Sequence, residues 1–337
     1  MMTRRIAAFA FAAVMLAAAT GAAPAAENEI RVVGAYGLQF LPTYVAVDNH
    51  LIEKHAKELG IADPKVVFNW VSNGGAINDA LISGNSDVGQ VPGPSLVLFW
   101  NKTRGAQAIR GVLAGSEIPP LLISVDPRIK TIDDYTDKDR IAMATVKSSS
   151  YAIMMQMAAA QRYGWDQRNK FDAISVQLGF AETMAALMSG GTEIKSTVIV
   201  PPYDAELLES GKGHQVLSLD DVLGGHGTLN VFATTETFHS QNPKAFAAVK
   251  AGLIEAIQFI NANPRAAAEL FLKREPIKHD ADWIVNILSN KKLVEFTPDP
   301  HRFGKLAEFL HKTGAVNAEP ASWRDLFFDQ AAGLDGN

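Results

Sequence analysis

The residues best suited to chemistry in this sequence gather in six short loops, each placed just after a predicted strand. The loops are rich in glycine, serine and aromatic residues, and they span 34–40, 72–75, 93–95, 147–151, 179–182 and 202–203. Several of them lead directly into predicted helices, whose first turns carry unpaired N–H groups and a partial positive charge. Such loops can hold an oxyanion even in an acidic protein, so we predict a binding site for a small anion.

The candidate ligand contacts fall into three groups. The polar and glycine contacts that we expect are Gln39, Ser72, Asn73, Gly74, Gly93, Ser95, Ser148 and Ser149. Aromatic walls are expected from Tyr36, Phe40, Tyr151, Phe180 and Tyr203. Lys147 is the candidate cation, and Glu182 is the candidate acceptor for a ring amino group. A serine or asparagine at these places also suits a helix N-cap, and for Ser72, Asn73 and Ser148 the two roles are compatible.

Catalytic patterns are weak by comparison. The chain has no cysteine, which removes thiol catalysis, iron–sulfur clusters and Cys-ligated zinc. Its eight histidines are scattered, and no two stand four residues apart as in a helical zinc motif. Lys147 and Ser148 are adjacent rather than three residues apart, and no nucleophile elbow, P-loop or dinucleotide fingerprint is present. We therefore expect a binding protein without catalytic residues, metal or cofactor.

Short apolar segments alternate with helical patterns along most of the chain, which predicts an α/β protein. Strands are expected at 30–34, 65–70, 87–91, 106–113, 121–125, 140–145, 174–178 and 196–200. Helices are expected at 41–59, 76–83, 94–101, 150–163 and 181–189, and almost continuously after about 235. The block 80–88 resembles the block 186–194, each being a helix end, a Ser-Gly stop and the approach to a strand. We interpret this repeat as two related lobes with a ligand cleft between them.

Length, composition and charge indicate the number of domains and exclude some classes of partner. The 337 residues are 47% hydrophobic and 20% charged, which is ordinary for a globular protein of about two domains. The formal net charge of −5 gives no electrostatic footprint for nucleic acid or an anionic membrane.

The N-terminal segment has the three parts of a secretory signal peptide. Arg4 and Arg5 precede the apolar run 6–19, and Ala23-Pro24-Ala25 offers a small-x-small cleavage site. The run is too short to span a bilayer, and later apolar runs such as 96–100 are shorter still. We expect a signal peptide at 1–25 and an exported, soluble chain, for which a bacterial periplasm fits best.

Four blocks give the chain a family resemblance. They are Leu41-Pro42-Thr43-Tyr44-Val45-Ala46-Val47 with the following 51–55, Ala80 to Gly89, 242–246 with 256–268, and Trp323-Arg324-Asp325-Leu326-Phe327. In their order and spacing they resemble the periplasmic solute-binding proteins of ABC importers for nitrate, taurine and alkanesulfonates, a family that also includes binders of pyrimidine thiamin precursors. One departure is Thr192-Glu193-Ile194, where Asp with a small residue is more usual.

The resemblance implies the two-lobed periplasmic binding protein type II fold, with two crossings between lobes and hinge-like closure. It places lobe I at 26–118 and 233–337 and lobe II at 119–232, with crossings near 118–125 and 227–234. It also implies a monomer that delivers a sulfonate, taurine or nitrate to an ABC permease and its ATPase subunits. A pyrimidine thiamin precursor or an aromatic acid is the alternative ligand. Pyrimidine synthases share this fold but carry a cysteine-rich segment that this chain lacks.

Overall fold

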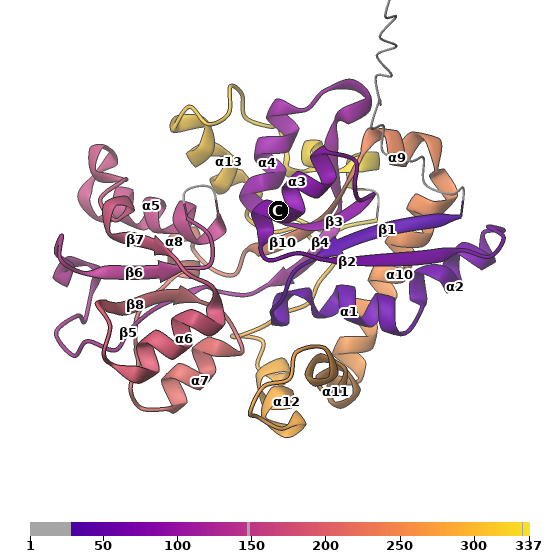
Figure 1. Ribbon diagram of the computed structural model, residues 1–337. Coiled ribbons are helices and arrows are strands. Elements are labelled where there is room, and N and C mark those ends of the chain that lie inside the picture. The colour runs from indigo at the N-terminus through magenta and orange to yellow at the C-terminus, as the bar shows by residue number, and fades with distance from the viewer. Residues whose placement is uncertain (1–27, 147–148, 332) are drawn as a thin grey trace, which may run out of the picture.

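Two five-stranded sheets form the frame of the molecule. The computed structural model describes residues 28–146, 149–331 and 333–337, so the expected signal peptide lies outside the described residues. In spatial order the first sheet contains β2 (Lys65–Trp70), β1 (Glu29–Gly34), β3 (Val88–Pro92), β10 (Thr228–Thr235) and β4 (Ile109–Glu117). The second contains β7 (Ser175–Gln177), β6 (Arg140–Met143), β8 (Ile194–Ile199), β5 (Leu121–Ser124) and β9 (His214–Ser218). Figure 1 shows the second sheet on the left and the first on the right.

The two sheets share one topology. In the first, β1 pairs in parallel with β2 and β3, and β10 runs antiparallel between β3 and β4. In the second, β6 pairs in parallel with β7 and β8, and β5 runs antiparallel between β8 and β9. The repeated blocks occupy equivalent places before β3 and β8, where Gly84 and Gly190 each have a φ of 71°. This left-handed conformation suits glycine after a helix end and agrees with the two related lobes read from the repeat.

Helices cover both faces of each sheet. Those around the first sheet are α1 (Leu41–Asp48), α2 (Leu51–Glu58), α3 (Gly74–Ile82), α4 (Gly93–Lys102), α9 (Glu236–Gln241), α10 (Pro243–Ala262), α11 (Pro264–Arg274), α12 (Ala281–Ser289) and α13 (Phe303–Lys312). Those around the second are α5 (Ser150–Tyr163), α6 (Phe180–Ser189), α7 (Tyr203–Glu209) and α8 (Leu219–Leu223). In Figure 1, α5 and α8 lie on one side of the second sheet and α6 and α7 on the other.

Alternation along the strands explains this double covering. Leu121 and Ile123 of β5 pack with Leu187 of α6 and Leu207 of α7, whereas Leu122 joins the larger core cluster. Successive strand side chains point to opposite faces, so a strand with apolar residues at successive positions, as at 121–123, must be covered on both faces.

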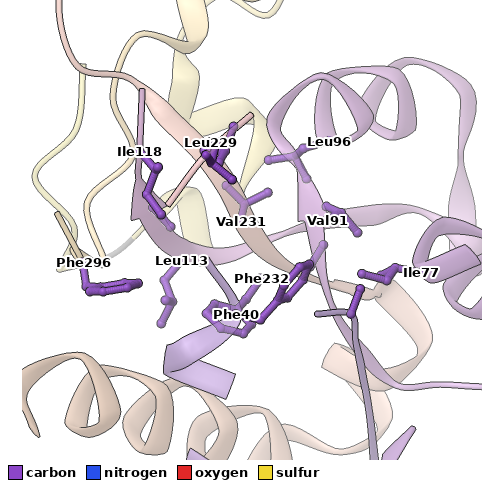
Figure 2. Packing of buried hydrophobic residues seen from close by; sticks show 14 of the residues in the cluster. Phe40, Ile77, Val91, Leu96, Leu113, Ile118, Leu229, Val231, Phe232 and Phe296 are labelled. Atoms are coloured by element: carbon purple, nitrogen blue, oxygen red, sulfur yellow. The ribbon is translucent and has the colours of Figure 1, made fainter. Parts of the chain in front are cut away.

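The core of the first sheet is formed by large side chains from distant segments. Figure 2 shows Phe232 and Val231 of β10 near Ile77 of α3, Leu96 of α4 and Phe40, which precedes α1. Each is at most 4% exposed. Burial of such a side chain contributes about 1.5 to 3 kcal/mol, so this cluster fixes the helices that begin beside the cleft.

Two elements have the predicted bounds, the strand 65–70 and the helix 150–163. The expected single helix 41–59 is wrong, because α1 and α2 are separated by a break at Asn49 and His50. His50 adopts a left-handed conformation with a φ of 52°. This turn places Ile52 against α10, where a Cβ added to Gly252 would lie 2.9 Å from the Ile52 backbone nitrogen.

The segment 203–235 differs most from expectation. It contains α7, β9, α8 and β10, none of which the sequence pattern indicated. β10 pairs with the first sheet from Thr228 onward, so we propose that the second crossing ends before Thr228 rather than at 232. The other expected lobe boundaries stay predictions.

A loop of the first lobe holds both crossings. Glu117, at the end of β4, exchanges two backbone hydrogen bonds with Glu295, of 2.7 and 2.9 Å. Thr228, at the start of β10, accepts a hydrogen bond on Oγ1 from the His301 backbone N–H at 2.8 Å. The end of β4, where the chain leaves the first sheet, and the start of β10, where it returns, are therefore both bonded to the segment 295–301.

α10 reaches the length of a membrane-spanning helix, although the sequence predicted no later apolar segment of that length. It is the one helix in the described residues with the length and composition to cross a membrane, with a mean hydropathy of 1.3 over its most apolar stretch. Its buried residues, among them Phe246, Val249 and Leu253, belong to the core cluster, and it packs against α1 and α2. A core helix of a soluble protein has the same length and composition.

Candidate functional site

A cavity of about 800 Å³ lies between the two sheets and is lined by residues of both. Its walls come from the segments that follow β1, β2 and β3 in the first sheet and β6, β7 and β8 in the second. The carboxyl ends of these parallel strands meet at the cavity, which is where open α/β sheets bind ligands. The loops selected from the sequence therefore converge on one place.

Most of the predicted contacts line this cavity. They are Tyr36, Gln39, Phe40, Ser72, Asn73, Gly74, Ser95, Ser149, Tyr151, Phe180, Glu182 and Tyr203. Gly93 is not among the lining residues, because it is a packing position where α4 meets β10, and a Cβ there would lie 3.2 Å from the Thr228 carbonyl oxygen. Lys147 and Ser148 lie outside the described residues. That the lining residues contact a ligand stays a prediction.

The N-terminus of α3 faces the cavity from the first lobe. Asn73 caps this helix, accepting a hydrogen bond on Oδ1 from the Ala76 N–H at 3.1 Å. Its Nδ2 donates to Ser72 Oγ at 3.1 Å. In the next turn Asn78 Nδ2 donates to Ser95 Oγ of α4 at 2.9 Å. The polar wall is thus held by its own hydrogen bonds, and Asn73 has the capping role that the sequence analysis allowed.

The N-terminus of α5 faces the cavity from the second lobe. Ser149 caps this helix by accepting from the Ala152 N–H at 3.2 Å and donates its hydroxyl hydrogen to the Thr145 carbonyl. Ser150 is 4% exposed, and its Oγ has no hydrogen-bond partner among the described residues. A buried hydroxyl without a partner is unfavourable, so this group suits a polar ligand atom.

Aromatic rings form much of the remaining wall. Tyr36 stacks on Trp70 with ring centroids 4.6 Å apart and planes inclined by 18°. In the second lobe the Phe180 ring centroid lies 5.3 Å from that of Tyr203 and 6.4 Å from that of Tyr151. Burial raises the pKa of Tyr203 to about 12, so its hydroxyl is a neutral donor at physiological pH.

Three charged side chains line the described part of the cavity, and each has a partner. Glu182 accepts from the Gly179 N–H at 3.2 Å, which closes the N-terminus of α6. Arg274 forms an ion pair with Asp48 of α1. Glu275 is 7% exposed and accepts from the Gly37 N–H at 2.6 Å and from Tyr44 Oη at 2.5 Å. Burial raises the pKa of Glu275, while these two hydrogen bonds oppose the rise.

A further carboxyl lies beside the cavity without lining it. Asp204 follows Tyr203 at the start of α7 and is 2% exposed. Its Oδ1 accepts from the Ala205 N–H at 2.6 Å. Burial raises the pKa of Asp204 to about 7, and the backbone hydrogen bond only partly offsets that effect.

One wall of the cavity was not predicted from the sequence, the segment Arg274 to Ile277 that follows α11. A charged pair directly before a proline was the available signal, but it lies far along the chain in a region that looked uniformly helical. Leu229 and Asn230 of β10 were also missed, because that strand was not expected. Asn78 lies one helical turn after the predicted contact Gly74, and Ser150 directly follows the predicted contact Ser149.

The fold and the cavity together define a class. Two α/β lobes of equal topology, joined by two crossings and enclosing a cavity at their strand ends, form the periplasmic binding protein fold. The sequence matches the NMT1-like family over residues 38–272, which is more than half of the chain. The chain therefore belongs to the NMT1-like family, and the predicted fold and family are confirmed.

Solved structures agree in fold. The periplasmic aliphatic sulphonate binding protein SsuA from Escherichia coli is similar with a TM-score of 0.65 and 18% identity, covering 90% of this chain and 92% of that chain. The alkanesulfonate-binding protein SsuA from Xanthomonas axonopodis pv. citri, bound to MOPS, gives 0.63 and 14%, covering 90% and 93%. The periplasmic nitrate-binding protein NrtA from Synechocystis PCC 6803 gives 0.63 and 16%, covering 88% and 83%. No curated protein matches the sequence.

Proposed function

We propose that this protein is the soluble solute receptor of an ABC importer. It binds a small anion of the sulfonate, taurine or nitrate class in the cavity between its lobes and delivers it to a membrane permease. One observation carries the proposal: the capped N-termini of α3 and α5 approach the same cavity from opposite lobes. Unpaired N–H groups and the helix dipoles at two such ends favour a negatively charged ligand.

The relatives in structure support the same proposal. Two are described as sulfonate-binding proteins and one as a nitrate-binding protein. Export to the periplasm, recognition by a permease with its ATPase subunits, and a monomeric state belong to this proposal. Each follows from the signal-like N-terminus and from the resemblance to receptors of ABC importers.

Binding without chemical change is part of the proposal. Each charged side chain of the cavity already has a partner. Glu182 accepts from Gly179, Glu275 accepts from Gly37 and Tyr44, and Arg274 pairs with Asp48. Such partners suit structural roles more than proton transfer. The Ser149 hydroxyl donates to a backbone carbonyl rather than to a general base. A nucleophile needs a base within hydrogen-bond reach, and this serine has a cap's partners instead.

Thermal-shift measurements on the mature protein test the proposal. The panel contains alkanesulfonates, taurine, nitrate, aromatic carboxylates and pyrimidines. A ligand present at 100 times its dissociation constant stabilises the folded state by about 2.7 kcal/mol, so a true ligand raises the melting temperature visibly. We expect at least one anion to do so. A response to pyrimidines with none to any anion would contradict the assigned ligand class.

Cap variants separate ligand contact from helix stability. We expect Ser149→Ala to lower ligand affinity and also to lower the stability of the free protein by about 1 kcal/mol, since it removes an N-cap. Thr235→Ala is the matched control, because Thr235 caps α9 away from the cavity by accepting from the Phe238 N–H at 3.2 Å. This control loses similar stability and keeps its affinity. Equal loss of affinity in both variants would show that Ser149 acts through folding alone.

A further inference from the structure

Tyr36 is unusual among the aromatic residues of this chain. Half of its surface is exposed, although its ring lies on the cavity wall. One face of the ring is covered by Trp70 in a stacked arrangement. An aromatic side chain that is stacked on one face and exposed elsewhere presents a flat apolar surface to whatever enters the cavity.

The ring beneath Tyr36 is fixed in place. Trp70, at the end of β2, meets Phe68 edge-on at 4.7 Å and Tyr44 at 5.1 Å. The Arg274 guanidinium lies 5.7 Å from the Trp70 ring centroid and is itself held by Asp48. The Trp70 ring is therefore held in a fixed position and supports the Tyr36 ring that stacks on it.

The backbone after Tyr36 is also fixed. Gly37 has a φ of 121°, and an added Cβ would lie 2.5 Å from the side-chain amide of Gln39. The Gly37 N–H donates to the Glu275 carboxylate, which also accepts from Tyr44 Oη. Glu275 thereby ties the loop that carries Tyr36 to the segment after α11. A surface prepared in this way loses little freedom on binding a ligand.

The second lobe offers rings to the same cavity. Phe180 and Tyr203 lie 5.3 Å apart with their planes inclined by 34°, and both line the cavity with Tyr36. The cavity volume of about 800 Å³ is far larger than a nitrate ion needs, since a water molecule occupies about 30 Å³ of the liquid. Space of this size, with aromatic surface from both lobes, fits a ligand with a ring.

The acidic group of the ligand has its own place. The N-terminus of α5, a helix of fourteen residues, opens onto the cavity beside Ser150. The buried Ser150 Oγ, without a partner among the described residues, is the polar atom available there. This end of the cavity is suited to a carboxylate or sulfonate, whereas the Tyr36 end is suited to a flat ring.

We propose that the ligand is a planar aromatic acid whose ring stacks on Tyr36, and that Glu275 is the positioning residue for that surface. This inference rests on the proposed function of a receptor for a small anion, and among such anions it selects aromatic acids over taurine and nitrate. It assigns the ring to Tyr36 and the rings of lobe II, and the acidic group to the first turn of α5.

Calorimetric titration with matched pairs of acids tests the inference. The pairs are benzoate with cyclohexanecarboxylate and benzenesulfonate with cyclohexanesulfonate, which differ in planarity but hardly in size. We expect the aromatic member of a pair to bind roughly 3- to 10-fold more tightly, since an aromatic pair gains energy beyond the area that it buries. Equal affinities within each pair would overturn the inference and leave the proposed function intact. Failure of every anion in the wider panel would instead remove the proposed function.

Variants assign the preference to residues. Tyr36→Leu should reduce the ratio of aromatic to cyclohexyl affinity towards one, and Tyr36→Phe should restore it. Glu275→Ala should lower the same ratio, whereas Glu275→Gln keeps an acceptor for the Gly37 N–H and should recover it. Ile82→Ala is the control, since Ile82 is 58% exposed and does not line the cavity. An unchanged ratio in Tyr36→Leu, or equal loss for both members of a pair in Glu275→Ala, would contradict the assigned roles.

Discussion

Asp204 shows how a single residue beside the cavity couples burial to pH. Its carboxyl is almost fully buried at the start of α7, next to the wall residue Tyr203. Burial raises its pKa from 3.8 to about 7, and no cation of the described residues opposes that rise. The folded protein therefore holds a proton on Asp204 between about pH 4 and pH 7 that the unfolded chain releases. Stability is lost as the pH rises through this window.

Asp204→Asn should remove this pH dependence. The amide keeps an oxygen that can accept from the Ala205 N–H and carries no charge at any pH. We expect the variant to be more stable than the natural protein above pH 7 by about 2 to 4 kcal/mol, with the difference shrinking towards zero near pH 4. Chemical denaturation at a series of pH values measures the difference.

Asp280→Asn is the matched control for Asp204→Asn. Asp280 also stands at a helix start, accepting from the Trp283 N–H at 3.0 Å, but it is exposed. Its exchange should produce no gain in stability that grows with pH. A constant difference between Asp204→Asn and the natural protein from pH 4 to 8 would show that burial does not control this carboxyl.

At this scale the sequence predicted the residues that act through local structure. Asn73 and Ser149 precede helices, and both cap them in the structure. Glu275 could not be predicted, because its partners Gly37 and Tyr44 are more than 200 residues away along the chain. A buried carboxylate of this kind is placed by tertiary contact, and no local spacing reveals it.

Among the elements, the contact between α2 and α10 depends on one glycine. Gly252 lies in the middle of α10, where glycine is unfavourable for a helix by roughly 1 kcal/mol relative to alanine. A Cβ there would lie 2.9 Å from the Ile52 backbone nitrogen and 3.0 Å from its Cα. Both atoms belong to the backbone of α2 and cannot rotate away, so the close approach of the helices outweighs helix propensity.

Gly252→Ala should therefore destabilise the protein, by about 1 to 3 kcal/mol as for other overpacked sites. Gly304→Ala is the contrasting control, because Gly304 lies in α13 and an added Cβ would meet nothing within 4 Å. That variant should gain up to about 1 kcal/mol. Thermal and urea unfolding compare the two. A gain in stability from Gly252→Ala would mean that α2 does not pack as closely as described.

Elements with strong local patterns were the predictable ones. β2 and α5 have the expected bounds, since residues that end or begin such elements flank them. Pro64 precedes β2, and α5 lies between its N-cap Ser149 and Gly164. β10 was missed because it lies between β3 and β4, strands formed more than 100 residues earlier, and a glycine-rich segment precedes it. The break between α1 and α2 was missed because His50 takes a left-handed turn that its residue type does not require.

For the whole molecule, the arrangement of the lobes is the feature that matters most. Besides the two crossings, the lobes are joined by side-chain contacts. Lys305 Nζ of α13 donates to the Leu223 carbonyl at the end of α8 at 2.8 Å. At another contact Trp283 of α12 donates from Nε1 to Glu209 Oε2 of α7 at 2.7 Å. His279 stacks on the Trp283 ring at 3.7 Å and supports it. This hydrogen bond joins the helices of the first sheet to the second on the side of the segment 274–277. It therefore stabilises the arrangement in which both lobes line one cavity.

Glu209→Ala should speed ligand release. A hydrogen bond of this kind contributes about 0.5 to 1.5 kcal/mol, so we expect the dissociation rate to rise roughly 2- to 10-fold. Stopped-flow displacement measures it. Glu58→Ala serves as the control, since Glu58 pairs with His55 within the first lobe. An unchanged release rate in Glu209→Ala would show that this contact does not help to hold the lobes together around a ligand.

The overall architecture could be predicted because the chain repeats itself. The blocks 80–88 and 186–194 mark equivalent turns in two sheets of the same topology, and the family resemblance implied the crossings. The helices that link the lobes at Trp283 and Glu209 could not be predicted, because the contact joins two surface side chains from separate lobes.

We propose above all that the cavity binds a small anion and leaves it unchanged. Isothermal titration of the mature protein with the anion panel, followed by mass spectrometry of the recovered compound, tests both parts at once. We predict saturable binding at one site per chain, weakened in Ser149→Ala, with the compound recovered intact. Absence of binding by every anion, or recovery of a chemically altered compound, would contradict the proposed receptor function.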